Sequence, residues 1–156
     1  MPPVFLNTSA FIKLYHQEKG STWLNSFIIG KTLIISELVL AESASTLGRL
    51  YRDGIYTKRQ SSLLYAQIYR DLKNYQLIPL GTKSQLNKFV SLAFNLPPGL
   101  RLRTLDGLHL AAAELARDSA QNQNPPQTLT FVSADIRLLA IGQVQGFVVE
   151  NPENYP

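Results

Sequence analysis

The feature that most constrains this chain is the alternation of short apolar runs with longer segments that repeat apolar residues at helical spacing. Strands that alternate with helices in this way are typical of a parallel sheet covered by helices. The sequence therefore predicts an α/β fold with a central parallel sheet of about five strands. The expected strands are 4–6, 32–36, 75–80, 128–133 and 147–150, and the expected helices are 9–16, 21–29, 37–51, 57–74, 84–96, 104–120 and a short one from Asp135.

The bulk composition is that of one domain covering residues 1–156. Of these residues 45% are hydrophobic and 17% charged, and no linker or internal repeat divides the chain. No run approaches the roughly 18 apolar residues of a membrane span, and MPPVFL lacks the features of a secretory signal. The absence of cysteine excludes disulfides, thiolate zinc sites and cysteine nucleophiles. We therefore expect a cytoplasmic protein with no membrane association.

The charge of the chain is unevenly distributed. Residues 49–103 contain ten Lys and Arg against two Asp, a net charge of +8, whereas the remainder has five bases and nine acids, a net charge of −4. A basic segment of this kind suggests a surface that faces a polyanion. The alternative is an ordinary solvated helix face.

Polar residues follow several of the expected strands. Ligands of parallel sheets bind outside the carboxyl ends of the strands, so these residues are candidates for a site. Each also has a structural interpretation: a helix N-cap, a first-turn acid beside the helix dipole or, for Glu42, a surface glutamate. His109 reads as a structural histidine beside a core stripe of Leu105, Leu108, Ala112 and Leu115. The candidates are Asn7, Thr8, Ser9, Ser36, Glu37, Glu42, Thr104, Asp106, Ser133 and Asp135.

Four segments in order resemble the motifs of PIN domains, and specifically of the VapC-type toxins of bacterial toxin–antitoxin pairs. The resemblance covers residues 4 to about 149. It implies a three-layer α/β/α sandwich whose acidic cluster binds Mg²⁺ or Mn²⁺ and hydrolyses RNA phosphodiesters as an endoribonuclease. It also implies a cognate antitoxin and a homodimer as partners. The segments are N-T-S-A-F-I-K-L-Y, I-S-E-L-V-L-A-E-S-A-S-T-L, L-R-T-L-D-G-L-H-L-A-A-A and F-V-S-A-D-I-R-L.

Position by position, the resemblance assigns catalytic roles to Glu42, Asp106 and Asp135 and metal binding to these three together with Asn7. Asn7 stands where the family usually has its first aspartate. An amide oxygen still ligates Mg²⁺ but brings no charge, so we predict a nuclease with weakened metal binding. The alternative is a degenerate PIN domain that acts as a nucleic-acid- or antitoxin-binding module. Supporting positions are Thr8, Ser9 and Ser133, and the bases expected to hold RNA are Arg49, Arg52, Arg101 and Arg103.

Overall fold

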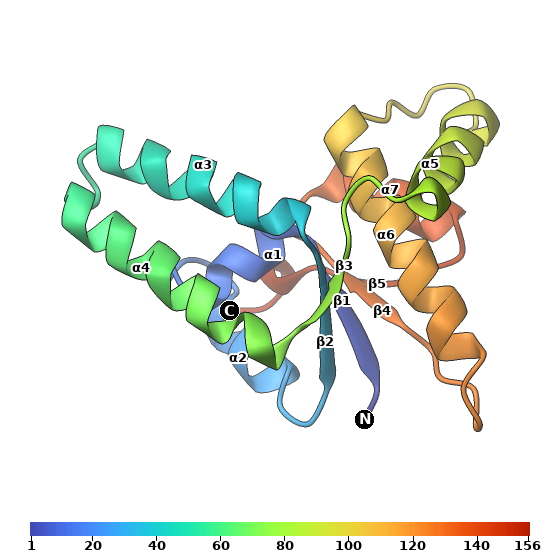
Figure 1. Cartoon of the computed structure of the whole chain (residues 1–156), viewed down its shortest axis with the longest axis horizontal. Coiled ribbons are helices and arrows are strands. Elements are labelled where there is room, and N and C mark those ends of the chain that lie inside the picture. Colours follow the sequence, from blue (N-terminus) through green and yellow to red (C-terminus); the bar gives the residue numbers. More distant parts are fainter.

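The computed structural model describes residues 1–156 and has a five-stranded sheet at its centre (Figure 1). The strand order is β3-β2-β1-β4-β5, and every neighbouring pair is parallel. The predicted α/β fold is therefore confirmed. The strands are β1 (Pro3–Leu6), β2 (Thr32–Ser36), β3 (Gln76–Ile78), β4 (Thr130–Val132) and β5 (Val148–Glu150).

Helices cover both faces of the sheet, which Figure 1 shows nearly edge-on between them. The first four helices lie on one face, and the last three lie on the other. This is the three-layer α/β/α arrangement. The helices are α1 (Thr8–Phe11), α2 (Ser21–Phe27), α3 (Leu38–Arg52), α4 (Lys58–Asp71), α5 (Lys83–Asn95), α6 (Thr104–Gln121) and α7 (Ile136–Val144), with short 3-10 turns η1 (Ile12–Leu14), η2 (Leu72–Asn74) and η3 (Pro152–Asn154).

The central strand β1 is buried on both faces, as expected for a parallel sheet between two helical layers. Phe5 belongs to the core beneath α5, α6 and α7, where its ring stacks on Phe131 at 5.7 Å between centroids. Val4 and Leu6 point to the other face and join the core beneath α1 to α4. No helix of the chain is both long enough and apolar enough to span a membrane.

The core stripe predicted for the segment 104–120 was right at Ala112, which is fully buried, and wrong at Leu105. Leu105 is 48% exposed, whereas Leu110 and the alanines that follow it are fully buried. The reason is that α6 packs against the sheet and against α5 at the same time. A Cβ at Gly107 would lie 2.5 Å from the ring of Phe89 on α5, so the two helices approach as closely as only glycine permits. Burial on two sides therefore extends over more of the helix surface than one stripe.

The predicted helix 9–16 was also wrong in its extent. Its α-helical part is the single turn of α1, and the chain continues as the 3-10 turn η1. The third strand, β3, is shorter than predicted and stops before Pro79. It does lie at the edge of the sheet, as this proline indicated, because proline cannot donate a hydrogen bond to a further strand.

The topology brings two loops together at the carboxyl edge of the sheet. From the central strand β1 the chain builds β2 and β3 outward on one side, and it later adds β4 and β5 on the other. The carboxyl ends of β1 and β4 therefore form a topological switch point, where ligands of open α/β sheets bind. The backbone N–H of Asn7 donates to the carbonyl of Val132 at 3.1 Å, which holds these two strand ends side by side.

Candidate active site

Asn7 is the first residue after β1, and its side chain caps α1. Its Oδ1 accepts hydrogen bonds from the backbone N–H of Ser9 at 3.1 Å and from the Ser9 hydroxyl at 2.6 Å. Because both partners are donors, the oxygen of the amide faces Ser9 and the Nδ2 group is turned away from it. The side chain therefore uses its oxygen for the cap and presents a hydrogen-bond donor elsewhere. The predicted cap role of Asn7 is confirmed.

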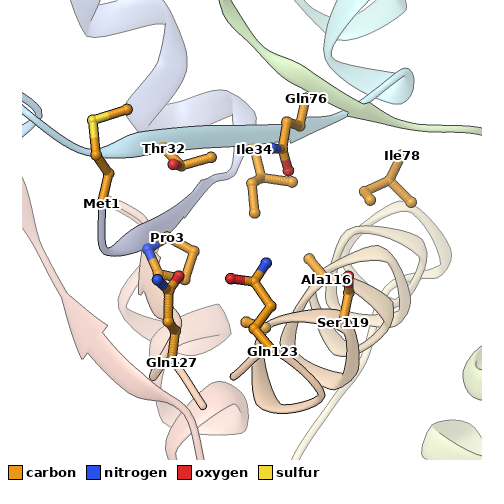
Figure 2. A pocket seen from close by; sticks show the side chains of 11 residues that line it. Met1, Pro3, Thr32, Ile34, Gln76, Ile78, Ala116, Ser119, Gln123 and Gln127 are labelled. Carbon is orange, nitrogen blue, oxygen red and sulfur yellow. The ribbon is translucent and has the colours of Figure 1, made fainter. Parts of the chain in front are cut away.

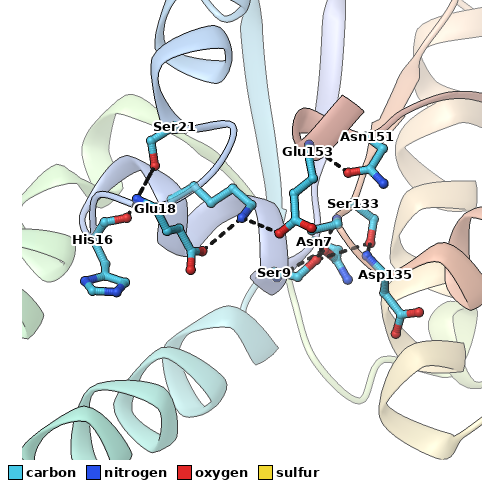
Figure 3. A network of polar contacts seen from close by, with 11 residues as sticks. Asn7, Ser9, His16, Glu18, Ser21, Ser133, Asp135, Asn151 and Glu153 are labelled. Atoms are coloured by element: carbon cyan, nitrogen blue, oxygen red, sulfur yellow. Dashed lines mark hydrogen bonds and ion pairs between the residues drawn. The ribbon is translucent and has the colours of Figure 1, made fainter. Parts of the chain in front are cut away.

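A short chain of hydroxyl groups joins the ends of β1 and β4 (Figure 3). Ser9 Oγ lies 3.2 Å from Ser133 Oγ and accepts from the backbone N–H of Ala134 at 2.9 Å. Since the Ser9 proton is directed to Asn7, Ser133 is the donor of the Ser9–Ser133 pair. Ser133 in turn accepts from the backbone N–H of Asp135 at 3.0 Å. The two serines thus fix the loop that carries Asp135 against the loop that carries Asn7.

Asp135 is the N-cap of α7. Its Oδ1 accepts from the backbone N–H groups of Arg137 at 2.9 Å and Leu138 at 3.3 Å. The structural interpretation of this aspartate as a first-turn acid was therefore wrong by one position, because it lies at the N-cap itself. The cap engages only Oδ1, so Oδ2 is left without a protein partner. The same carboxylate can thus cap the helix and offer an oxygen to a ligand.

Asp106 lies in the first turn of α6 and is partly buried. Burial raises the pKa of its carboxyl, and the nearby negative charge of Asp135 raises the pKa further; Glu42 adds a smaller contribution in the same direction. His109 and Arg103 act against this rise. No hydrogen bond contributes to the shift, so both oxygens of Asp106 are free. The three acids thus share one electrostatic environment in which the Asp106 charge is disfavoured.

Glu42 lies in the second turn of α3 and is half-buried, unlike an ordinary surface glutamate. Its Oε1 accepts from the Thr8 hydroxyl at 3.1 Å and contacts Nε2 of His109. Burial raises the pKa of this carboxyl, but the interactions with His109 and Thr8 outweigh burial and lower it. Glu37, the other acid after β2, has a structural contact, because its Oε2 accepts from the backbone N–H of Leu80 at 2.9 Å.

The donor set of these acids suits a hard divalent cation. Asp106 and Asp135 line one depression of about 480 Å³, while Glu42 lines a depression of about 420 Å³ beside it. The side chains do not surround one point as three ligands would. Mg²⁺ keeps several waters, however, and takes only one or two carboxylates from a protein. The free oxygens of Asp106 and Asp135 meet that need, and an added cation would relieve their repulsion.

Arginines surround the depression that contains Asp106 and Asp135. Arg101 and Arg103, which were predicted from the sequence to hold RNA, line this depression. Arg137, which was not predicted, lines it as well. Arg49 lines the neighbouring depression with Glu42. Arg52 is the last residue of α3, at the far end of the α3–α4 hairpin. The basic segment is therefore split between that hairpin and the loop before α6, on opposite sides of the site.

Lys13 lies beside this site and forms ion pairs with Glu18 and Glu153, which are labelled in Figure 3. Its side chain is 2% exposed, and Nζ contacts Oε1 of Glu18 at 3.0 Å and Oε1 of Glu153 at 2.9 Å. A buried ammonium requires such partners. Because Glu153 belongs to η3, the two ion pairs hold the C-terminal turn against η1.

A further cavity lies at the opposite, amino edge of the sheet (Figure 2). It measures about 180 Å³ and lies between the starts of β1, β2 and β3 and the end of α6. Its walls carry the side-chain amides of Gln76, Gln123 and Gln127, and no ionisable side chain lines it. Neutral amides do not titrate and bring no charge to a cation, so the carboxyl edge, with its three acids, is the candidate active site.

Comparison with known proteins identifies the fold. No family model and no curated protein matches the chain. Among solved structures, the chain is similar to FitAcB from Neisseria gonorrhoeae, with a TM-score of 0.70, 15% identity and coverage of 97% of this chain and 99% of that chain. The chain has the VapC-type PIN fold. The chain is also similar to VapBC2 from Rickettsia felis bound to a promoter DNA fragment, with a TM-score of 0.63, 18% identity and coverage of 95% of this chain and 97% of that chain. For DNA-bound VapBC from Salmonella typhimurium the TM-score is 0.65 and the identity 12%, with coverage of 97% of this chain and 99% of that chain.

Proposed function

We propose that this PIN-fold protein is a divalent-cation-dependent endoribonuclease of the VapC toxin type. The observation that carries the proposal is the environment of Asp106. Its carboxyl is partly buried and accepts no hydrogen bond, and its pKa is raised by burial and by Asp135 and Glu42. Clustered carboxylates repel one another, and here the nearby bases do not cancel the rise in the Asp106 pKa. Their presence at the switch point of the sheet is accounted for by a cation and an anionic substrate.

The side chains divide the work according to their free oxygens. Asp106 and Asp135 would hold Mg²⁺ or Mn²⁺, which would supply positive charge beside the scissile phosphodiester. Asn7 would bring no charge to the cation, and its oxygen is already hydrogen-bonded to Ser9. Its role would be to hold Ser9, which fixes the loop that carries Asp135. Glu42, whose Oε2 has no partner, would orient the attacking water and accept its proton. Its lowered pKa keeps it ionised for that task at neutral pH.

The arginines would hold the phosphates of the RNA. Arg101, Arg103 and Arg137 lie around the same depression as the acids, so they would contact the nucleotides next to the cleaved bond. Arg49 would contact the backbone on the Glu42 side. Such contacts are electrostatic and weaken as salt increases. Binding of RNA is therefore expected to decrease steeply between low and physiological ionic strength.

The first test is the cleavage of an end-labelled, structured RNA by the native protein in Mg²⁺ and in Mn²⁺. We expect cleavage with either cation, faster in Mn²⁺, and complete loss of it in EDTA. Cleavage that continues in EDTA would contradict the cation-dependent mechanism. No cleavage of any tested RNA with either cation, by a protein shown to be folded, would contradict the proposed activity.

A second function is favoured by the orientation of Asn7. Its Nδ2 donor stands where an aspartate would offer a second oxygen, which disfavours a cation there. On this alternative the protein is a silent PIN domain that binds nucleic acid or an antitoxin. Binding of RNA by the native chain without cleavage, and cleavage by Asn7→Asp, would establish it.

We also propose that the protein acts with an antitoxin and as a homodimer. The antitoxin is suggested by the solved structures of similar fold, one of which is a toxin–antitoxin complex from Klebsiella pneumoniae. The homodimer is supported by an apolar stripe on α5, where Leu86, Val90 and Phe94 repeat every four residues and are 46%, 51% and 85% exposed. We expect light scattering at micromolar concentration to give the mass of two chains. The mass of a single 17.4 kDa chain would contradict the homodimer.

A further inference from the structure

His109 lies one turn beyond Asp106 on α6, and the proposed function leaves it unused. It is 1% exposed, yet its ring does not pack into the core as a merely apolar group. Nε2 contacts Oε1 of Glu42 and lies 3.2 Å from Oγ1 of Thr8. Nδ1 is buried and has no partner at all. The imidazole thus makes all of its polar contacts through one nitrogen, and these contacts are with the site.

The partners decide where the proton of the ring is. A carboxylate only accepts hydrogen bonds, so Nε2 must carry a proton to approach Oε1 of Glu42 so closely. This holds whether the ring is neutral or charged. A neutral ring with its proton on Nδ1 would place two acceptors face to face and would bury an unpaired N–H. In the neutral form the bare nitrogen is therefore Nδ1, which faces no donor.

The same oxygen of Glu42 also accepts from the Thr8 hydroxyl at 3.1 Å. Oε1 thus has two donors, from α6 and from α1, while Glu42 itself comes from α3. Both donors act on one oxygen and leave Oε2 free. A change of rotamer, or any rotation of the carboxylate other than the exchange of its two equivalent oxygens, would lose both contacts.

We propose that His109 is a positioning residue, whose Nε2–H together with the Thr8 hydroxyl holds Oε1 of Glu42 so that Oε2 is presented to the substrate side of the site. His109 would contact neither RNA nor a cation. Its contribution would be the fixed orientation of the carboxylate that receives the proton of the attacking water. This inference rests on the proposed function, because it specifies how one residue of that site is held.

Cleavage kinetics of matched variants provide the first test. Removal of a group that orients an active carboxylate typically lowers activity by about 10- to 100-fold, so we expect His109→Leu to lower kcat by that factor with little change in KM. His109→Gln places an amide N–H near the position of Nε2, and it is expected to recover most of the native kcat. The control Ser43→Ala removes a buried, unpartnered hydroxyl from the residue next to Glu42 and should leave kcat unchanged.

Native kcat in folded His109→Leu would overturn the positioning role while leaving the proposed ribonuclease intact. Equal losses in His109→Leu and His109→Gln, with both variants folded, would also overturn it. An effect on KM alone would assign His109 to substrate binding and contradict the proposal. The free energy of unfolding of each variant, measured by urea titration, shows which variants are folded at the assay temperature.

A spectroscopic test does not need activity. The chain has two histidines, so ¹⁵N-histidine NMR resolves both rings, and the His109→Gln spectrum assigns them. We expect a proton on Nε2 of His109 and a clear shift of this resonance in Glu42→Gln. A proton on Nδ1 alone, or a His109 resonance that Glu42→Gln does not move, would overturn the inference. If no RNA is cleaved, the ribonuclease proposal fails, and this measurement alone decides the contact of His109 with Glu42.

Discussion

Asp106→Asn is expected to abolish RNA cleavage and to stabilise the folded protein at neutral pH. The loss should be at least about 100-fold in kcat, the scale on which one lost electrostatic group lowers the rate of an enzyme. The gain in stability follows from the raised pKa of Asp106: burial and the charges of Asp135 and Glu42 make its ionised form unfavourable in the folded state. Asparagine has nearly the same shape and removes that charge.

The sign of the pH dependence follows from the same shift. The pKa of Asp106 is higher in the folded protein than its ordinary value of 3.8, so the folded state binds more protons between these two values. The destabilisation is therefore complete above the folded pKa, decreases as the pH falls, and disappears below about 3.8. Urea titrations of native protein and Asp106→Asn should show curves that differ most at neutral pH and converge in acid.

Asp118→Asn is the matched control for this variant. Asp118 is on the same helix, is 46% exposed, and pairs with Lys88 outside the site. We expect native cleavage by this variant and a small loss of stability, in the range of about 0–1 kcal/mol that exposed ion pairs contribute. Near-native cleavage by Asp106→Asn would mean that the site is elsewhere. A loss of stability in that variant would mean that Asp106 has a structural partner.

The architecture was predictable because it depends only on the spacing of apolar residues and on the order of strands and helices along the chain. Buried strands such as Val4–Leu6 read as continuous apolar runs, and helices separate them in the chain. The rule that ligands bind at the carboxyl ends of strands then selects the loops after β1, β2 and β4. Asn7, Ser133 and Asp135 were placed at this edge from sequence. The hydrogen bonds that join them required coordinates, because they connect loops that are distant in the chain.

His109 was interpreted from the sequence as a structural histidine and Arg137 was missed, for different reasons. His109 follows Asp106 by three positions, so one helical turn places them on the same face. Only the structure reveals that its side chain contacts Glu42, which comes from α3 on the other side of the sheet. Arg137 lies two residues after Asp135, outside the basic segment 49–103. Counting charge by segment therefore passed over it. The error at Leu105, like the interpretation of His109, comes from tertiary packing that the sequence does not show. The second surface that buries α6 belongs to α5.

Asn7→Asp is expected to increase the affinity for Mn²⁺ and Mg²⁺ by at least about tenfold, since cation affinity depends on the number of charged ligands. An aspartate at this position keeps the cap, because one oxygen still accepts from the N–H and the hydroxyl of Ser9. Its second oxygen replaces Nδ2. A further carboxylate at this edge of the sheet also increases repulsion among the acids, so the variant should be less stable than the native protein without a cation and should gain more from adding one.

Calorimetric titration with Mn²⁺, followed by RNA cleavage, separates the possible roles of Asn7. Asn151→Asp is the control, because Asn151 also follows a strand at this edge and caps a turn, but it lies after the outer strand β5. If Asn7→Asp binds and cleaves more strongly than native protein and Asn151→Asp does not, the charge at position 7 limits a working site. If the native protein already binds tightly and Asn7→Asp adds nothing, the site is not weakened. Cleavage by Asn7→Asp alone would mean that the native chain is a silenced nuclease whose role is binding, since Glu42, Asp106 and Asp135 would then be competent and only the amide would prevent the reaction.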